Sequence, residues 1–449
     1  MKTDTDQRLN VPRTLKLGTF HIGSSFIDLL TSGVLNRVLI TDLALSATPV
    51  ALLSALRYLL APLSIWAGYR SDLRPPGTLR RLPFIWGGRL PMLLSLPLLP
   101  IVTALLAADP ASVAGWTLAL FAFLIYGVGT LISGSTYLSL VRDSAPPARR
   151  GQALAIVQVF LVISFPVAGV VYGGLMPVYD QESFWRLVLI GMAIAFGFIA
   201  FALWGAEKPA SVPAGVDPTP PEPFLPLLRQ MWSDVRARRF FLFLALGAVS
   251  AFAQDAVLEP FGGDVFGLDN GQTTRFNAYW GIGVVISLLA TVYFTRHRAA
   301  HEQTGVTKIG LALTALPLFL LGVLAVTEWQ ALLIPVLVMF GLGFGIYTVG
   351  AVSLLAAMTT ERHAAAYLGL WSMTQLLFRG LGIFAGGAVR DVALGISGSY
   401  AIAYASVFLL EAIGLIACIA ILQQVDVPGF ARGEAKPLGA TVTLAAADG

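Results

Sequence analysis

Residues Leu56 to Trp86 read LRYLLAPLSIWAGYRSDLRPPGTLRRLPFIW, and this stretch decides the fold class. It passes from one apolar segment, through a short loop with four arginines and one aspartate, directly into another apolar segment. Apolar segments joined by short basic loops are typical of proteins that cross a membrane many times. Small residues let two helix ends approach, and an aspartate can pair with arginines there. The loop therefore predicts a latch between two helices, made by Gly68, Asp72, Arg80 and Arg81.

The alternative is that the four arginines of this loop only fix the orientation of the chain in the bilayer.

Composition supports a membrane protein in either case. Charged residues make up 12% of the 449 residues, hydrophobic residues make up 56%, and the mean hydropathy is +0.77. Because the net charge of +4 is spread over many loops, we expect the lipid bilayer and not nucleic acid as a partner. Cys418 is the only cysteine, which excludes an intrachain disulfide, and we predict no metal site.

Twelve segments between residues 17 and 423 are apolar over the roughly 20 residues that cross a bilayer. The first continues to about Ile40, which is too long for the core of a signal peptide, so we expect it to be retained. Most of the 29 lysines and arginines fall on the side that holds both chain ends. The positive-inside rule therefore predicts that both termini are cytoplasmic.

A Pro-rich stretch after the sixth segment divides the chain into two halves that resemble each other. YGVGTLISGSTYLSL from Tyr126 matches FGLGFGIYTVGAVSLL from Phe340 at a constant offset. We predict an all-α polytopic membrane protein with 12 transmembrane helices in two pseudo-symmetric six-helix bundles. The predicted parts are an N-terminal tail (1–16), a first bundle (17–206), a linker (207–238), a second bundle (239–423) and a C-terminal tail (424–449).

Charged residues inside the spans are costly and should be paired or face a cavity. In a two-bundle transporter the first, second, seventh and eleventh helices line the central space. The residues predicted to line this cavity and to contact a substrate are Asp28, Arg57, Asp255 and Arg379. Asp28 is a candidate protonation site, because desolvation raises the pKa of a carboxylate, and pairing with Arg57 is the alternative.

Arg37 and Glu259 lie toward the non-cytoplasmic ends of their spans. We hypothesise that Arg37 pairs with Asp255 or Glu259 and gates that mouth. The alternatives are a static ion pair, or side chains that reach the headgroups. His21 could be an axial ligand to the magnesium of a tetrapyrrole, or a histidine at a helix end in the membrane interface. No nucleophile, acid–base pair or phosphate cradle stands out, so we expect no enzyme activity.

Three stretches resemble the bacteriochlorophyll delivery family of the major facilitator superfamily, the family of the PucC- and LhaA-type light-harvesting assembly proteins. The most specific is AFAQDAVLEPFGGDVFGLDNGQTTRFNAYWGIG from Ala251. The others are GVLNRVLITDLAL and LRYLLAPLSIWAGYRSDLRP. Besides Asp255 and Glu259, the motif residues are Gln254, Pro260, Gly262, Gly263, Gln272, Thr273 and Thr274. The loop from Gly68 to Arg81 also resembles the loop that joins the second and third helices of major facilitator proteins.

The resemblance implies a multi-pass protein of a bacterial inner membrane, the photosynthetic intracytoplasmic membrane, that helps assemble light-harvesting antenna complexes. It would bind or deliver bacteriochlorophyll or a related tetrapyrrole, scaffold antenna polypeptides, or both. Bacteriochlorophyll synthase and a second copy of the chain (a homo-oligomer) are further candidate partners. An ion-coupled transporter of a small amphipathic solute, with Asp28 as coupling carboxylate, is the alternative. A membrane enzyme acting on a lipid or tetrapyrrole has the least support.

Overall fold

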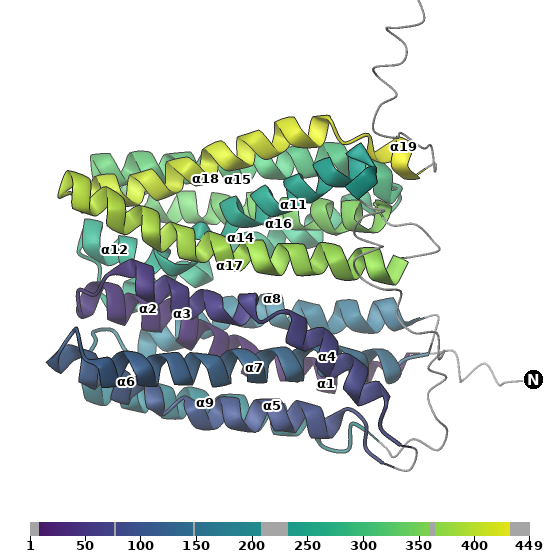
Figure 1. Ribbon diagram of the computed structural model, residues 1–449, viewed down its shortest axis with the longest axis horizontal. Coiled ribbons are helices and arrows are strands. Elements are labelled where there is room, and N and C mark those ends of the chain that lie inside the picture. Colours follow the sequence, from purple (N-terminus) through teal and green to yellow (C-terminus); the bar gives the residue numbers. More distant parts are fainter. Residues whose placement is uncertain (1–8, 76–77, 147–148, 208–231, 359–363, 432–449) are drawn as a thin grey trace, which may run out of the picture.

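The computed structural model describes residues 9–75, 78–146, 149–207, 232–358 and 364–431, which fold into helices joined by short connections (Figure 1). The first half contains α1 (Val11–Leu29), η2 (Leu30–Val34), α2 (Leu35–Arg37), η3 (Val38–Asp42), α3 (Ala47–Leu59), α4 (Pro62–Asp72), α5 (Leu82–Ser95), α6 (Leu98–Ala108), α7 (Val113–Asp143), α8 (Arg150–Leu175) and α9 (Gln181–Leu203).

The second half contains α11 (Val235–Phe252), η5 (Ala253–Ala256), α12 (Leu258–Phe266), α13 (Asn270–Thr274), α14 (Phe276–Thr295), η6 (Ala300–Gln303), α15 (Thr304–Thr327), η7 (Gln330–Leu332), α16 (Leu333–Ala357), α17 (Ala364–Ser397), α18 (Tyr400–Gln423) and α19 (Val427–Ala431).

The predicted all-α membrane fold is confirmed. In the part of the chain that the structure describes, 10 helices are long and apolar enough to cross a membrane, or 11 if α11, η5 and α12 form one bent span. The first predicted span, 17–41, lies in a helical segment that two π-helical turns, η2 and η3, interrupt. The count of twelve crossings therefore stays a prediction.

Three element boundaries differ from the predicted ones. α1 begins at Val11, before residue 17, because Asn10 accepts a hydrogen bond from the backbone N–H of Arg13 at 3.1 Å and caps the helix. α11 begins at Val235, inside the predicted linker, and α19 lies inside the predicted C-terminal tail. Most of the linker and the rest of that tail lie outside the described residues.

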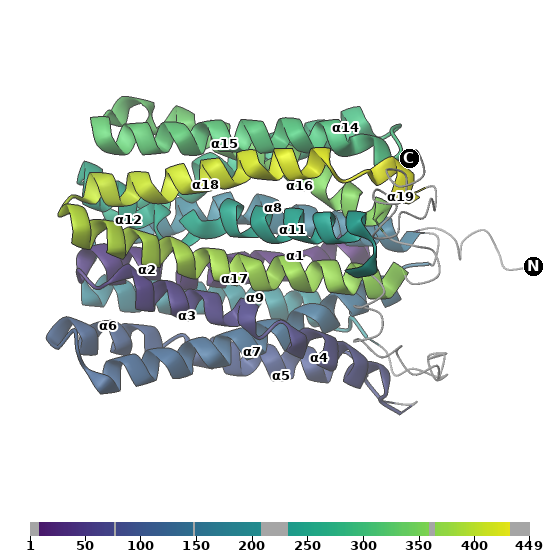
Figure 2. The ribbon, with the colours of Figure 1, turned by 45° about the horizontal axis from the view of Figure 1, so that its top comes forward.

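The helices of each half lie together, with α1 to α9 in the lower part of Figure 1 and α11 to α18 in the upper part. The halves meet where α3 packs on α17 and where α8 packs on α14. α1 begins and α19 ends at the same end of the molecule, on the right in Figures 1 and 2. We call this the terminal end and the opposite end, which includes α12 and the start of α3, the distal end.

The glycines that echo each other in the two halves occupy equivalent helix crossings. Gly127 of α7 packs on α3 and Gly129 packs on α5. In the second half, Gly341 of α16 packs on α14 and Gly343 packs on α15. Small residues allow such close approach of helix backbones inside a membrane. The sequence repeat therefore corresponds to a repeated packing pattern.

Gly386 on α17 provides a test of this packing. A Cβ at Gly386 would collide with the backbone carbonyl of Ala253, whereas a Cβ at Gly395 on the same helix meets nothing within 4 Å. Gly386→Leu should lower the free energy of unfolding by about 1–3 kcal/mol through overpacking. Thermal unfolding in detergent measures the effect, with Gly395→Leu as the matched control. Equal melting temperatures for the two variants would contradict the described crossing.

Candidate functional site

Two ion pairs, one from each half, lie in the middle of the molecule. Arg57 Nη1 is 2.8 Å from Asp28 Oδ1, and Arg379 Nη2 is 2.9 Å from Asp255 Oδ2. Their side chains are 16% to 32% exposed although they lie within helical spans, so they face a space inside the protein. The structure thus places each predicted cavity residue in one of two ion pairs. The pairing of Asp28 with Arg57, one of the two alternatives for Asp28, is observed.

Tyr58 joins the two ion pairs across the halves. Its ring centroid lies 4.7 Å from the Arg57 guanidinium and 4.8 Å from the Arg379 guanidinium. Cations within about 6 Å of an aromatic ring centroid are attracted by the face of the ring. The Tyr58 hydroxyl also accepts a hydrogen bond from Arg57 Nη2 at 2.7 Å. We call Asp28, Arg57, Tyr58, Asp255 and Arg379 the central cluster.

Tyr126 of α7 completes the first-half side of the central cluster. Its hydroxyl donates to Asp28 Oδ1 and accepts from Arg57 Nη1 at 2.7 Å. Sequence reasoning gave neither Tyr58 nor Tyr126 a role in the site. The position of Tyr58 next to an intramembrane arginine was the available signal, whereas no local pattern marks Tyr126.

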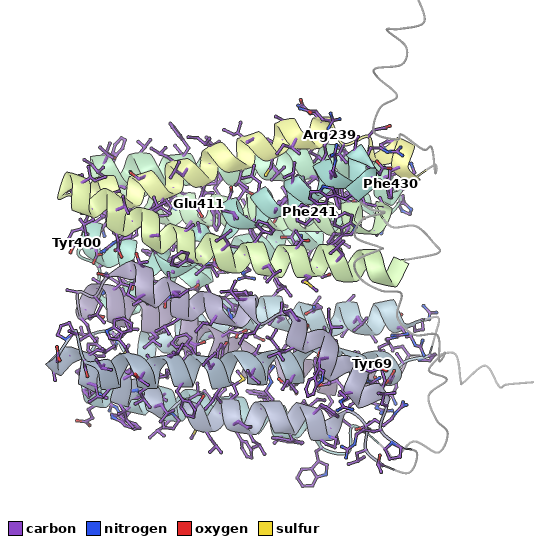
Figure 3. All side chains as sticks on the ribbon, viewed as in Figure 1. Tyr69, Arg239, Phe241, Tyr400, Glu411 and Phe430 are labelled. Carbon is purple, nitrogen blue, oxygen red and sulfur yellow. The ribbon has the colours of Figure 1, made fainter. Side chains whose placement is uncertain are left out.

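A break in the α11–α12 helix positions Asp255. The chain turns through 48° there, and η5 carries Asp255 at the bend. The backbone N–H of Gln254 donates to Glu411 Oε1 on α18 at 2.7 Å. Glu411 lies midway along the upper bundle (Figure 3) and is 3% exposed. Because a freed backbone group inside a membrane must find a partner within the protein, Glu411 stabilises the break.

The predicted ion pair between Arg37 and Asp255 or Glu259 is not formed. Arg37 Nη1 lies 3.0 Å from Asp42 Oδ1 instead, in the same π-interrupted segment. Arg37 Nη2 donates across to the second half, to the backbone carbonyl of Leu268, at 3.1 Å. A carboxylate five residues away on its own segment supplies the partner, so Arg37 needs no carboxylate from the other half.

Glu259 is held by residues from the same motif. Asn277 Nδ2 donates to its carboxylate at 2.5 Å and Thr274 Oγ1 donates at 3.3 Å. Glu259 is 4% exposed, and a Cβ at Gly33 of the first half would collide with it. Glu259 therefore packs at the seam between the halves, and no described residue forms an ion pair with it.

Other motif residues shape the distal turn between α12 and α13. Asp269 and Gln272 form a capping box at the start of α13. A Cβ at Gly263 would lie 2.5 Å from the Arg37 guanidinium, so only glycine leaves room for that arginine. Gly262 packs against the side chains of Phe276 and Thr273. The carbonyl of Pro260 accepts a hydrogen bond from the hydroxyl of Thr41 in the first half.

Asp391 of α17 ties the second half to the first at the distal end. Its carboxylate accepts from the backbone N–H of Ala47 at 3.0 Å and from that of Thr48 at 2.7 Å, at the start of α3. The Thr48 hydroxyl donates to it as well, at 2.7 Å. Arg390 lies 2.8 Å from Asp264 and 2.9 Å from Asp391. The carboxylate caps a helix of the opposite half, where the helix dipole favours negative charge.

Two more hydrogen bonds join the halves at this end. Asn270 Nδ2 donates to Asp42 at 2.8 Å, and the N–H of Gly271 donates to the carbonyl of Pro177 at 2.8 Å. Within the described ranges, the hydrogen bonds between the halves lie at the distal end. The structure is therefore closed there.

The family model described as "PUCC protein" matches residues 34–430 of the chain, from α2 to α19. The chain belongs to the PUCC family. The match covers both halves, and therefore includes the central cluster except Asp28, together with the distal closure.

Curated relatives agree with the PUCC assignment. Protein PucC of Cereibacter sphaeroides is 28% identical over 396 residues, 86% of this chain and 84% of the relative. The "Bacteriochlorophyll synthase 44.5 kDa chain" of Rhodobacter capsulatus is 29% identical, with 84% and 87% covered. An "uncharacterized protein in puhA-bchM intergenic region" of the same species is 27% identical, with 94% and 91% covered.

Solved structures confirm the fold of this PUCC-family chain as a major facilitator fold. A bacterial homolog of the human lysosomal transporter Spinster, inward-facing and unoccupied, matches with a TM-score of 0.69 at 17% identity and covers 95% of this chain and 99% of its own. The nucleoside transporter NupG matches with a TM-score of 0.64 at 14% identity, with 93% and 99% covered. These likenesses show the fold alone.

The latch of the PUCC-family chain forms at the terminal end. Arg81 Nη2 lies 2.5 Å from Asp72 Oδ1 and 3.0 Å from Asp143 Oδ2. Arg81 Nη1 donates to the hydroxyl of Ser71 at 2.5 Å. Gly68 has open space where a Cβ would stand, so close approach of helices is not the reason for that glycine. The equivalent loop of the second half, 359–363, lies outside the described residues.

Glu207 is a latch residue that the sequence did not reveal. Its carboxylate accepts from the backbone N–H groups of Arg80, Arg81 and Leu82 at 2.8 to 3.0 Å, at the start of α5. Glu207 follows the sixth predicted span and is far from this loop in sequence, so no spacing pattern connects them. The surrounding hollow of about 250 Å³ is lined by Arg13, Arg80, Arg81, Leu140, Asp143, Ser144, Ala206 and Glu207.

Arg81→Ala should lower the free energy of unfolding by about 1–2 kcal/mol. The substitution leaves the carboxylates of Asp72 and Asp143 without their partner. These side chains are 40% and 35% exposed, so water solvates them and the destabilisation is limited. Thermal unfolding at low and high salt measures the effect. Arg70→Ala, also in this loop, is the control, and equal melting of the two variants would exclude the latch.

His21 lies inside the first half, on α1, and not at a helix end in the membrane interface. The side chain is 9% exposed, with Tyr137 edge-on at 5.1 Å and Phe20 at 5.9 Å between ring centroids. A tetrapyrrole needs an open approach, many ångströms wide, to a ring nitrogen. His21 does not offer one, so this residue does not fit an axial ligand in the described conformation.

Proposed function

We propose that the chain is an assembly factor for bacterial light-harvesting antenna complexes. The PUCC family match over residues 34–430 carries the proposal. It is supported by relatives named Protein PucC and by a relative named as a chain of bacteriochlorophyll synthase. In this role the chain binds or delivers bacteriochlorophyll, scaffolds antenna polypeptides, or both, and performs no catalysis itself.

The central cluster supports a role in handling a large amphipathic molecule. Arg379 lies 4.0 Å from the Phe252 ring centroid and 4.8 Å from that of Tyr58, so cationic donors and aromatic faces adjoin each other. A pigment with a flat ring system and carbonyl substituents offers a complementary surface. Residues of the central cluster, and not His21, would contact such a pigment.

The proposed location is the photosynthetic inner membrane, with the terminal end in the cytoplasm. The arginines and lysines near the terminal end support this orientation. The proposed partners are the antenna polypeptides, bacteriochlorophyll synthase and, for a homo-oligomer, a second copy of the chain. Exposed apolar side chains on the outer helices, such as Ile286 and Phe319, offer surface to lipid or to a partner helix.

Deletion of the gene in a photosynthetic host tests this function. We expect the near-infrared antenna absorption to fall while the pigment precursors and the reaction centre are still made. Complementation with the wild-type chain should restore the absorption. A deletion strain with full antenna absorption would refute the proposed function.

A second candidate function is ion-coupled transport of a small amphipathic solute. The observation that favours it is the partly exposed Asp28–Arg57 pair at the centre of a fold shared with solved transporters. Purified chain in vesicles should then accumulate solute when a proton gradient is imposed, and Asp28→Asn should abolish the coupling. Absence of gradient-driven uptake would remove this candidate.

A further inference from the structure

A series of aromatic rings runs from the seam between the halves to the central cluster. Phe165 and Trp280 have ring centroids 6.1 Å apart, and Trp280 and Phe344 are 6.2 Å apart. Phe344 and Phe252 are 5.5 Å apart, and the Arg379 guanidinium lies 4.0 Å from Phe252. We call Phe165, Trp280, Phe344 and Phe252 the aromatic track.

The aromatic track is not fully covered by the surrounding side chains. Its rings come from α8, α14, α16 and α11, so both halves contribute. All four side chains are only partly buried, whereas Phe240 and Phe243 in the core of the second half are 0% exposed. Rings that served only to fill a core would be covered like these two. The track is therefore a surface on which a flat molecule can stack.

Two hydrogen-bond donors along the track are buried and unpartnered. These are Trp280 Nε1 and Arg379 Nε, which find no acceptor in the part of the chain that the structure describes. Both groups can only donate. A buried donor without an acceptor costs free energy, so its presence points to an acceptor from outside the protein. A carbonyl or ester oxygen meets that need.

The outer end of the track lies at the tight contact between α8 and α14, where the two halves meet. A Cβ at Gly281 would lie 2.6 Å from Pro166, and a Cβ at Gly173 would lie 2.7 Å from the carbonyl of Gly271 toward the distal end. Phe165 directly precedes Pro166 on α8, and Trp280 directly precedes Gly281 on α14. The first two rings of the track therefore lie beside this contact, and each half contributes one of them.

We propose that the aromatic track binds a flat, conjugated, carbonyl-bearing molecule with a hydrocarbon tail. Its ring stacks along the track, and its carbonyl oxygens accept from Trp280 and Arg379. This inference rests on the proposed function and gives it a binding surface. A tetrapyrrole pigment and an isoprenoid quinone share this chemistry, and the test separates them.

The full-length chain in lipid nanodiscs is titrated with bacteriochlorophyll a and, separately, with ubiquinone. Induced circular dichroism of the bound pigment and quenching of tryptophan fluorescence report binding. Trp280→Phe keeps the ring and removes the donor, which should weaken pigment binding by about 2- to 10-fold, the usual range for one net hydrogen bond. Phe344→Leu removes one stacking surface and should weaken it by a similar factor.

Phe319→Leu is the matched control, because Phe319 is 49% exposed on α15 and lies outside the track. It should leave the dissociation constant unchanged within about 2-fold, a few tenths of a kcal/mol. Pigment binding that both track variants weaken and the control does not supports the track as a pigment site. Saturable binding of ubiquinone alone, weakened by the same variants, supports the track but assigns it to a quinone.

Absence of binding by either molecule, or identical binding by all variants, overturns the proposal. The deletion strain tests the proposed function by a different readout. A strain that loses its antenna while the variants bind pigment like the wild type would contradict the track alone. A strain that keeps its antenna while the track binds pigment would contradict only the assembly role.

Discussion

Arg57→Ala is expected to lower the free energy of unfolding by about 3–5 kcal/mol, the usual cost of removing one partner of a desolvated ion pair. The substitution leaves Asp28 without its cation and removes donors from Tyr58 and Tyr126. The Arg57 side chain is 16% exposed, so water replaces little of what is lost. We expect poor accumulation in the membrane and a large drop in melting temperature.

Thermal unfolding in detergent measures this loss, with Arg142→Ala as control, because Arg142 is exposed at the terminal end. The double variant Asp28→Asn with Arg57→Gln should recover part of the stability, since neither charge is then left alone. If the Arg57→Ala and Arg142→Ala variants have the same melting temperature, the ion pair between Asp28 and Arg57 contributes nothing to stability.

Asp391→Ala is expected to open the distal end. The substitution removes three hydrogen bonds to the start of α3 and one ion pair to Arg390. Hydrogen bonds to charged groups contribute about 1.5–3 kcal/mol each, so a loss of roughly 3 kcal/mol in total is a conservative expectation. Such a loss moves the equilibrium between closed and open forms by about 100-fold.

Cysteine labelling measures the opening. In a Cys418→Ser background, the substitution Leu45→Cys reports access to the distal end, because Leu45 is 5% exposed and lies two residues before α3. Labelling by a water-soluble maleimide should accelerate at least tenfold with Asp391→Ala. Asp109→Ala, in an exposed distal loop, is the control. Equal labelling rates in the two variants would show that Asp391 does not hold the end closed.

The membrane class, the two halves and the four charged residues of the central cluster could be predicted, because intramembrane charges and long apolar segments follow from strong physical costs. Charges inside a membrane need partners, and that rule, together with the helices that line the central space of a two-bundle transporter, selected Asp28, Arg57, Asp255 and Arg379. The free-energy cost of an unpaired charge in the membrane does not determine which charged residues pair with each other. Arg37 satisfies its need within its own segment, through a π-helical turn that no sequence period predicts.

The contacts of Asp391 at the distal end and Glu207 at the terminal end could not be predicted for a related reason. Asp391 and Glu207 lie near span ends, where a carboxylate costs little and no rule demands a partner. Both accept hydrogen bonds from backbone N–H groups at helix starts that are distant in sequence. Such contacts depend on the arrangement of the helices in space and leave no local pattern.

The central claim is that this PUCC-family chain handles pigment during antenna assembly. The most direct measurement is an absorption spectrum of the chain purified in mild detergent from a photosynthetic host, together with identification of the polypeptides that accompany it. The account predicts a stoichiometric near-infrared band and antenna polypeptides in the same fraction. A colourless chain without antenna polypeptides would contradict it.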